Sequence, residues 1–393
     1  MAVILATASY DETLRFWDPS TARCTAVIGL QQKPATAIAI SPDKRSIIAA
    51  SNPTIRMFEV PDGSRGASDE PVITFAGHTA AVSSVGWHRR GKFLLSGSED
   101  GTVKVWTTES PKAVRSLDCK SPVTSVSILP NMVDLVAVDR DGRLNLWDLR
   151  TGLLRQRVRP TAGPAEARRL PLSAVGVSSR VSCVAAASHS GLVHLWWAQK
   201  GLEGVVLRPS PTCLEAHADY VTRIAFSPSS SAMVTASADK TARLWAPARA
   251  DSHSGGSRAR GGAPPAAAAA GDSAGSSSAA GAAAAAGSAG GGGASAAPAG
   301  GGASSASAAD EAAAAVTWVP TASLIGHEGW VWDATFNADG SYVFTGGADA
   351  TARLWEAASG DLVQTFAGHS KAVCAVAVHD AQVPAATSSG RER

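Results

Sequence analysis

Short runs of alternating apolar and polar residues cover most of the chain, and polar turns separate the runs. Residues 82–87, 93–98 and 102–106 each alternate with a period of two, which predicts three β-strands joined by tight turns. Residues 72–75 predict an outer strand just before this group. Because the connections are short, we expect antiparallel hairpins and sheets of four strands.

The pattern recurs along the chain, and each copy ends in an aromatic anchor. The anchors are Trp17, Phe58, Trp106, Trp147, Trp196, Trp245 and Trp355. They are about 41 to 49 residues apart, except for the last interval, which is near 110. A period of this size is typical of one four-stranded propeller blade, and seven blades around an axis cover each other's apolar faces. The sequence therefore predicts an all-β, seven-bladed β-propeller over residues 1–379.

The long interval contains a low-complexity segment, residues 247–315, that consists almost entirely of Ala, Gly, Ser and Pro. Such a composition offers too little large apolar surface to offset the entropy of ordering, so we expect a disordered insertion. Residues 316–324 then predict the missing outer strand. This places the insertion between the third and fourth strands of blade six, on the bottom face. The last residues, 380–393, are expected to form a disordered tail.

Three blades carry the same polar residues at the same distances before the anchor. These are His78, Ser96 and Asp100 before Trp106, His217, Thr235 and Asp239 before Trp245, and His327, Thr345 and Asp349 before Trp355. WD-repeat propellers have a structural tetrad at these positions, in which Asp, His, hydroxyl and indole are hydrogen-bonded in series. A Ser-His-Asp hydrolase uses the same residue types, but an active site is normally one constellation in one cleft. A network that recurs three times indicates structure, so we expect no catalytic residues.

The first blade has Thr7, Asp11 and Trp17 but no preceding histidine or first strand. Both are found at the other end of the chain, where His369 is followed by an apolar run at 372–378 with no anchor after it. We therefore expect the C-terminal segment to complete blade one, so that the ring has no free sheet edges.

Three blades depart from the tetrad pattern. In blade two, Phe58 stands in place of the anchor Trp and Asn52 in place of the turn Asp. The Trp147 blade keeps only Asp141 of the polar residues, and the Trp196 blade has Ser190 where Asp is expected. The three departing anchors are Phe58, Trp147 and Trp196. These blades should be less rigidly specified.

Charge and cysteine content exclude several functions. Lys and Arg total 35 against 33 Asp and Glu, a net charge of +2, which gives no broad electrostatic surface for nucleic acid or an anionic membrane. The five cysteines are far apart and show no zinc or redox spacing. No basic segment precedes the short apolar start, and no run is long enough to span a membrane. We expect a cytoplasmic protein that reaches endomembranes only through partners, with no cofactor, metal, small-molecule substrate or direct membrane insertion.

Four segments are more specific than the repeat signature. They are VILATASYDETLRFWDPSTARCTAVI at 3–28, IRMFEV at 55–60, GWVWDATFNADGSYV at 329–343 and GHSKAVCAVAVHD at 368–380. They resemble the G-beta-like WD-repeat subunit of the target-of-rapamycin kinase complexes, whereas blades four and five match more loosely and the insertion is not part of the family pattern. The resemblance implies a non-catalytic scaffold that binds and stabilises the kinase domain in nutrient and growth signalling.

Other classes of propeller are distinguished by features outside the ring. A G-protein β subunit would carry an N-terminal coiled-coil helix, but here the first strand is expected at about Val3. A ubiquitin-ligase substrate receptor would need an adaptor-binding module, which the sequence does not show. A histone-binding propeller remains open on fold alone and would be favoured by an acidic top face. A propeller enzyme would need a polar constellation unique to one blade.

The contact face is expected where the strands meet the top surface. The third and the fifth residue after each leading histidine should emerge there. The residue before each turn Asp should emerge there as well. In blades six, seven and one these are Tyr220, Thr222, Ala238, Trp330, Trp332, Ala348, Ala372, Cys374 and Tyr10. Tyr220, Trp330, Trp332 and Tyr10 would form one aromatic patch, and exposed aromatics are common hot-spot residues. The alternative is that one of the two Trp side chains packs into the blade.

Overall fold

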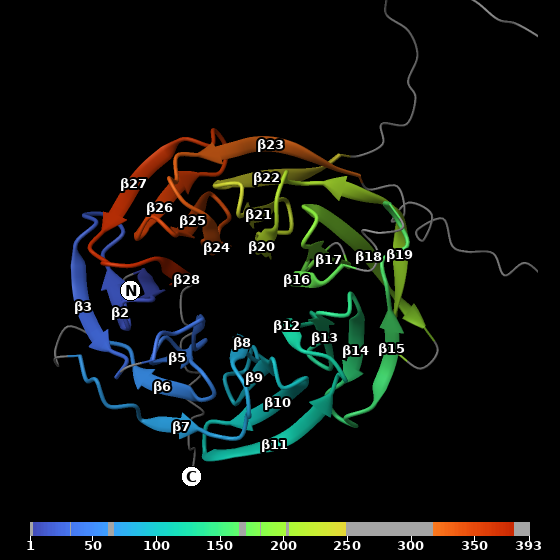
Figure 1. The fold of residues 1–393 in the computed structure, drawn as a ribbon, viewed down its shortest axis with the longest axis horizontal. Coiled ribbons are helices and arrows are strands. Elements are labelled where there is room, and N and C mark those ends of the chain that lie inside the picture. The colour runs from blue at the N-terminus through green and yellow to red at the C-terminus, as the bar shows by residue number, and fades with distance from the viewer. Residues whose placement is uncertain are drawn as a thin grey trace, which may run out of the picture.

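Seven four-stranded antiparallel sheets surround a central axis as blades (Figure 1). The protein was analysed as a computed structural model, which describes residues 3–31, 33–61, 67–164, 170–180, 182–201, 204–248 and 317–380. In these ranges the regular elements are all β-strands, and no helix is long and apolar enough to cross a membrane. The predicted all-β, seven-bladed fold is confirmed.

Blades one to three follow the predicted strand order. Blade one is β28 (Val373–His379), β1 (Ile4–Ser9), β2 (Thr13–Trp17) and β3 (Cys24–Gly29). Blade two is β4 (Ala37–Ile40), β5 (Ser46–Ala50), β6 (Ile55–Glu59) and β7 (Ile73–Phe75). Blade three is β8 (Val82–Trp87), β9 (Phe93–Ser98), β10 (Thr102–Thr107) and β11 (Ser110–Asp118).

Blades four to seven repeat this order, with longer outer hairpins in blades five and six. Blade four is β12 (Val123–Ile128), β13 (Asp134–Asp139), β14 (Leu144–Asp148) and β15 (Leu154–Val158). Blade five is β16 (Leu172–Val177), β17 (Cys183–Ser188), β18 (Leu192–Gly201) and β19 (Gly204–Glu215). Blade six is β20 (Val221–Phe226), β21 (Met233–Ser237), β22 (Thr241–Ala248) and β23 (Thr317–Ile325). Blade seven is β24 (Val331–Phe336), β25 (Tyr342–Gly347), β26 (Thr351–Glu356) and β27 (Leu362–Ala367).

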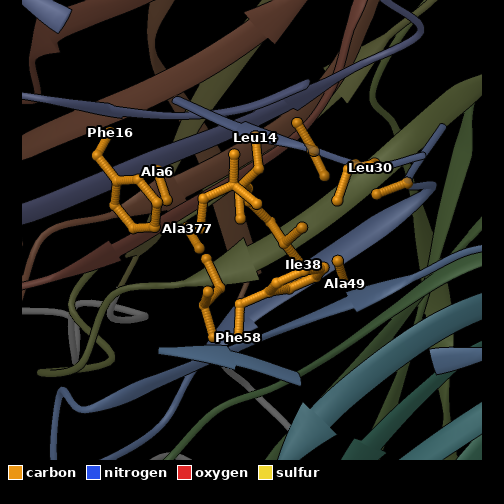
Figure 2. Close-up of a cluster of buried hydrophobic side chains, with 13 residues drawn as sticks. Ala6, Leu14, Phe16, Leu30, Ile38, Ala49, Phe58 and Ala377 are labelled. Atoms are coloured by element: carbon orange, nitrogen blue, oxygen red, sulfur yellow. The ribbon is translucent and has the colours of Figure 1, made fainter. Parts of the chain in front are cut away.

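The hydrophobic core is divided among the contacts between neighbouring blades. Figure 2 shows the cluster between blades one and two, where Leu14 and Phe16 face Ile38 and Phe58. Each such side chain contributes about 1.5–3 kcal/mol when it is fully buried. Because a blade presents apolar residues on both faces, its stability depends on having a neighbour on each side.

The ring closes between the two ends of the chain, as the sequence predicts. Strand β1 pairs with β28 antiparallel, from Ile4 opposite His379 to Ser9 opposite Val373. The N and C labels in Figure 1 mark the chain ends, and β28 lies beside the first strands of the blade. The first strand thus has a hydrogen-bonded neighbour on each edge, and no described blade is left open.

The four predicted tetrads are all present. In blade three, Nε1 of Trp106 donates to Oγ of Ser96 at 2.8 Å, and Ser96 lies 2.8 Å from Nε2 of His78. Nδ1 of His78 lies 2.7 Å from the carboxylate of Asp100. The same bonds recur in blades six and seven, among His217, Thr235, Asp239 and Trp245 and among His327, Thr345, Asp349 and Trp355.

The fourth tetrad joins the ends of the chain. Nε2 of His369 lies 2.8 Å from Oγ1 of Thr7, which accepts from Nε1 of Trp17 at 2.7 Å. Nδ1 of His369 lies 2.9 Å from the carboxylate of Asp11. The closing contact is therefore specified by directional hydrogen bonds as well as by strand pairing.

The electrostatics of a tetrad fix the direction of its hydrogen bonds. Burial opposes ionisation of Asp100, but hydrogen bonds from Thr102 and His78 outweigh it and lower the pKa of this carboxyl to about 2. Burial lowers the pKa of His78 more than the Asp100 carboxylate raises it. At neutral pH the imidazole is therefore neutral, donating from Nδ1 to the carboxylate and accepting the Ser96 hydroxyl proton at Nε2.

Blade two has no polar network at the tetrad positions. Phe58 lies opposite Ile47, and Ala49, two residues further on, stands where the tetrad blades have their hydroxyl; Ala49 and Phe58 belong to one apolar cluster and are each no more than 1% exposed. Asn52 stays exposed in the turn. Replacing every partner of a buried network by apolar groups leaves no unsatisfied donor, so this blade avoids the cost of a partial network.

Blade four corrects one prediction. Asp141 is not its buried carboxylate, because it lies in the exposed turn and forms an ion pair with Arg143 at 3.0 Å. The buried residue is Asp139, which accepts from Asn145 at 3.1 Å and from the backbone of Arg143 at 2.9 Å. In blade five, Ser190 lies 2.8 Å from Ser188 rather than bonding an imidazole.

The insertion begins slightly later than predicted. Pro247 and Ala248 belong to β22, where they pair with Trp318 and Thr317 of β23, so the sheet itself extends past the predicted boundary. Residues 249–316 and the tail from 381 onward lie outside the described residues. Ala248 and Thr317 are directly opposite each other, so the segment leaves and rejoins the sheet at one hairpin end.

Removing the closing strand should destabilise the ring. Deleting the chain from Gly368 onward should remove β28, expose the edge of β1 and lower the free energy of unfolding by several kcal/mol, from a typical total of about 5–15 kcal/mol. Thermal melting followed by circular dichroism measures this effect. A chain ending at Asp380 is the matched control, because it keeps β28. Equal melting temperatures for the two truncations would contradict the closing role.

The Thr345 hydroxyl can be tested without changing the volume of its side chain. Thr345→Val should leave both the Trp355 indole and Nε2 of His327 without a partner, at a cost of about 2–4 kcal/mol. Thr345→Ser keeps the hydroxyl and should cost only about 1 kcal/mol. Denaturant midpoints measure both variants, and equal losses would show that packing, not hydrogen bonding, matters at this position.

The hairpin end of blade six should accept a short connection. Replacing residues 249–316 by an Asn-Gly turn should leave the melting temperature nearly unchanged, because the paired residues on either side already have hairpin geometry. The matched comparison is the same Asn-Gly dipeptide inserted between Leu94 and Leu95, inside a buried strand, which should destabilise the fold. A large loss of stability in the shortened chain would show that the segment supports the ring.

Candidate protein-binding face

The top face of the ring opens into the central channel through a cavity of about 250 Å³ that residues of all seven blades line. This face carries the connections between blades and the turns between second and third strands. Three of the four predicted patch residues, Tyr10, Tyr220 and Trp332, line the cavity. The fourth, Trp330, is in contact with Trp332.

The two tryptophans of blade seven differ in exposure. Trp330 is 46% exposed, whereas Trp332 is half-buried at the channel wall. Their ring centroids are 5.4 Å apart with planes inclined by 53°. The backbone carbonyl of Trp330 accepts from the N–H of Ala348 at 2.8 Å, which fixes the start of β24. Trp330 is therefore the more exposed of the two, and neither ring belongs to the buried core.

The two tyrosines lie at separate points of the channel mouth. Tyr10 is 40% exposed, and its N–H donates to the carbonyl of Ala372 at 3.0 Å. Tyr220 packs edge-on against the His189 ring, with centroids 4.5 Å apart. Burial raises the pKa of both tyrosines, so both phenols are protonated at neutral pH and can donate hydrogen bonds.

The opposite side of the mouth carries charged residues that the sequence interpretation missed. Arg140 of blade four forms an ion pair with Glu99 of blade three. Both line the same cavity as the aromatic residues. Each directly precedes a turn aspartate, the position that the sequence rule already marked in blades six, seven and one. Applying the rule to every blade would have found them.

Inter-blade hydrogen bonds hold the channel wall together. Four hydroxyls and one thiol each donate to a backbone carbonyl of the next blade at 2.5 to 3.0 Å. These bonds run from Thr36 to Val82, Ser83 to Val123, Thr124 to Leu172, Thr222 to Val331 and Cys374 to Ala35. Thr222 and Cys374, which the sequence rule placed at the top surface, are half-buried and line the same cavity as Tyr220 and Trp332. Ala238 is buried, at 4% exposed.

Blade seven has a different connection next to Trp332. The carboxylate of Asp333 accepts from the N–H of Val376 in blade one at 2.8 Å and lies 3.1 Å from Nε of Arg223 in blade six. Burial raises the pKa of Asp333, although the Arg223 guanidinium favours the ionised form. One side chain thus connects three blades and supports the strand that carries the tryptophan pair.

The tetrad hydroxyls are not accessible to a substrate. The hydroxyls of the four tetrads belong to side chains that are 0% exposed, so none can reach a substrate; they are Thr7, Ser96, Thr235 and Thr345. Within the described ranges, no three His, Cys, Asp or Glu side chains are grouped so that they could hold a metal ion. The arrangement is suited to binding a protein surface at the aromatic mouth.

The repeats match a known family model. The family described as "WD domain, G-beta repeat" matches residues 69–107, 111–148, 209–246 and 318–356. Each match begins near the outer strand of one blade and ends with the third strand of the next. The sequence repeat is therefore offset from the structural blade by one strand, which is why the two ends of the chain share blade one.

Two of the three relatives described here are named as subunits of target of rapamycin complexes. Over 148 residues the chain is 39% identical to "Target of rapamycin complex subunit wat1" of Schizosaccharomyces pombe, covering 38% of this chain and 46% of the relative. It is 40% identical over 135 residues to "Protein LST8 homolog" of Dictyostelium discoideum, covering 34% and 43%. It is 35% identical over 155 residues to "Target of rapamycin complex subunit LST8" of Bos taurus, covering 38% and 45%.

The matched part spans less than half the length of each of these relatives. Seven closed blades, four tetrads and four repeat matches agree with the similarity that the sequence segments indicated. The chain is therefore a seven-bladed β-propeller in which four segments match the WD-repeat model, and over part of its length it is similar to subunits of target of rapamycin complexes.

Proposed function

We propose that this chain is a non-catalytic scaffold subunit of target-of-rapamycin kinase complexes, and that it binds and stabilises the kinase domain in the cytoplasm. The printed names of its relatives support membership of such a complex. The observation that carries the proposal of a binding face is the exposure of Trp330, at 46%, on a channel mouth built by all seven blades.

The top-face patch of Tyr10, Tyr220, Trp330 and Trp332 has the make-up of a binding hot spot. An exposed tryptophan offers a large apolar area at a small loss of side-chain entropy, and such residues dominate binding energies at interfaces. Trp332 packs beside Trp330 and limits the directions that the exposed ring can take. The partner therefore meets a surface that is already organised before binding.

The ion pair of Arg140 with Glu99 gives the mouth a polar side that is nearly neutral. This arrangement does not favour a strongly basic histone tail, which would need an acidic face. It is compatible with a folded domain that places an apolar element on the tryptophan pair and polar groups opposite. A protein kinase domain therefore fits this face better than a histone-binding partner does.

Removing the aromatic anchor should abolish kinase binding without unfolding the ring. Trp330→Ala should weaken the affinity for the kinase at least about thirtyfold, because truncating a hot-spot aromatic costs about 2 kcal/mol or more. The double variant with Trp332→Ala should abolish co-purification from the native source. Affinity capture and circular dichroism should be measured together. Tyr342→Ala is the matched control, because Tyr342 is a 37% exposed aromatic at the other end of the same blade.

Two results would contradict this assignment. If Trp330→Ala folds normally and binds the kinase with full affinity, the contact face lies elsewhere on the ring. If Tyr342→Ala loses as much affinity as Trp330→Ala, the top face has no special role. If only the double variant has a low melting temperature, Trp332 supports the blade. The affinity of the single variant Trp330→Ala then decides whether the face binds the kinase.

A further inference from the structure

The turns between the first and second strands of the blades give an internal comparison of one face. Six such turns lie at the bottom of the ring, at residues 41–45, 88–92, 129–133, 178–182, 227–232 and 337–341. Their sequences are SPDKR, HRRGK, LPNMV, SSRVS, SPSSSA and NADGS. The first two contain five Lys or Arg residues, whereas the other four together contain one. The positive charge of these six turns is therefore concentrated on blades two and three.

The two basic turns lie next to each other in space. A Cβ placed on Gly91 would lie 3.7 Å from Cδ of Pro42, and the Trp87 indole donates to the carbonyl of Ala39 at 3.0 Å. Arg45, Arg89, Arg90 and Lys92 are exposed, while Lys44 is half-buried. These four exposed cations, together with the 39% exposed Phe93 that follows them, define the basic bottom patch.

The four cations of the basic bottom patch are available to bind another molecule. None of its four cations has a carboxylate within ion-pair distance among the described residues. Asp43 is the single acidic side chain of the two turns, and it is occupied by the Ser41 hydroxyl at 2.5 Å and the Arg45 N–H at 3.1 Å. The whole chain carries a net charge of only +2, so this local excess is offset by acidic groups elsewhere.

The backbone of the patch offers few directional contacts. In the turn of blade three, Gly91 donates to the His88 carbonyl at 2.7 Å and Arg90 to Nδ1 of His88 at 3.2 Å. In blade two, Lys44 donates to the Ser41 carbonyl at 2.9 Å. The turns are thus rigid projections with satisfied N–H groups and free side-chain charge. Such a surface suits a diffuse plane of negative charge better than a peptide or RNA, which needs base or backbone recognition.

We propose that the basic bottom patch binds the surface of a bilayer that contains anionic lipids. Each Lys or Arg near such a surface contributes about 1 kcal/mol, and clusters of four or more are typical of binding to acidic headgroups. Phe93, 39% exposed, places an aromatic ring beside the charges, a combination found in protein elements that lie on a membrane surface. The chain lies on the bilayer without entering its hydrocarbon core.

The position of the patch is compatible with simultaneous assembly. The first-to-second strand turns and the aromatic mouth lie on opposite faces of the ring, because antiparallel strands carry the chain from one face to the other. A membrane on the bottom face therefore leaves Trp330 accessible. This inference does not depend on the proposed kinase binding, and it goes beyond the sequence-based expectation that membranes are reached only through partners.

Vesicle flotation with the purified full-length chain tests the proposal. The chain should float with vesicles of phosphatidylcholine that contain about one third phosphatidylserine, but not with phosphatidylcholine alone, and binding should fall as salt rises. The triple variant Arg89→Gln, Arg90→Gln and Lys92→Gln should bind about a hundredfold more weakly. Phe93→Ser should bind several-fold more weakly to vesicles, while its binding to soluble polyglutamate stays unchanged.

The matched control removes three exposed lysines from the top face by Lys120→Asn, Lys240→Asn and Lys371→Gln. Both triples change the net charge from +2 to −1. The Asn replacements suit positions 120 and 240, whose φ angles are 67° and 71°. If the two triples lose vesicle binding equally, net charge and not the patch is responsible, and the proposal is wrong.

Two further outcomes separate the possible partners. If the chain binds polyglutamate or single-stranded RNA but does not float with anionic vesicles, the patch serves an acidic macromolecule and the membrane proposal is overturned. Trp330→Ala should float like the unaltered chain, which supports a membrane contact separate from the kinase face. If Trp330→Ala instead loses flotation, the bottom patch does not carry the contact.

Discussion

A blade of four strands has two apolar faces, and no blade can cover both by itself. Every other feature of this molecule depends on that constraint, because the faces are covered only when the ring is complete. The clusters between neighbouring blades, such as the one that joins Leu14 with Ile38, exist because each sheet has a neighbour on either side. Pairing of β1 with β28 supplies the last neighbour. The tetrad of His369 and Thr7 then fixes the relative position of the two chain segments, which apolar packing alone would not fix.

The blades differ in whether the buried anchor side chain has a hydrogen-bond partner. Four blades keep a complete series of donors and acceptors, whereas blade two has apolar Ala49 and Phe58 where those blades have the hydroxyl and the indole. Blade five keeps the indole of Trp196 but not a complete network, since no described residue accepts a hydrogen bond from Nε1 of Trp196. Complete networks and complete apolar replacements both avoid a buried unsatisfied group, and an incomplete network does not. The blades that depart from the repeat are therefore not equivalent to one another.

The fold and the tetrads could be predicted because both depend on constant spacing. A fixed strand and turn length places histidine, hydroxyl and indole at the same offsets in the four tetrad blades, so the positions can be counted back from the anchor Trp. The buried carboxylate of blade four could not be identified, because Asp139 ends β13 and Asp141 lies in the following turn, and only packing decides which of the two is buried. The difference between Trp330 and Trp332 was also hidden, because Trp330 precedes β24 and the strand pairing shifts register at Trp332, so regular alternation does not predict the exposure of the two rings.

The pairing of β1 with β28 also determines when folding can finish. Thr7 and His369, which are 362 residues apart, must meet before the last blade exists. Contacts between residues so distant in sequence make folding slow, because a long loop has to close before they contribute any stability. On the ribosome β1, β2 and β3 are synthesised well before β28, the strand that pairs with β1. During that interval β1 has an open edge that can pair with other chains, so the step most exposed to aggregation comes just before the ring closes.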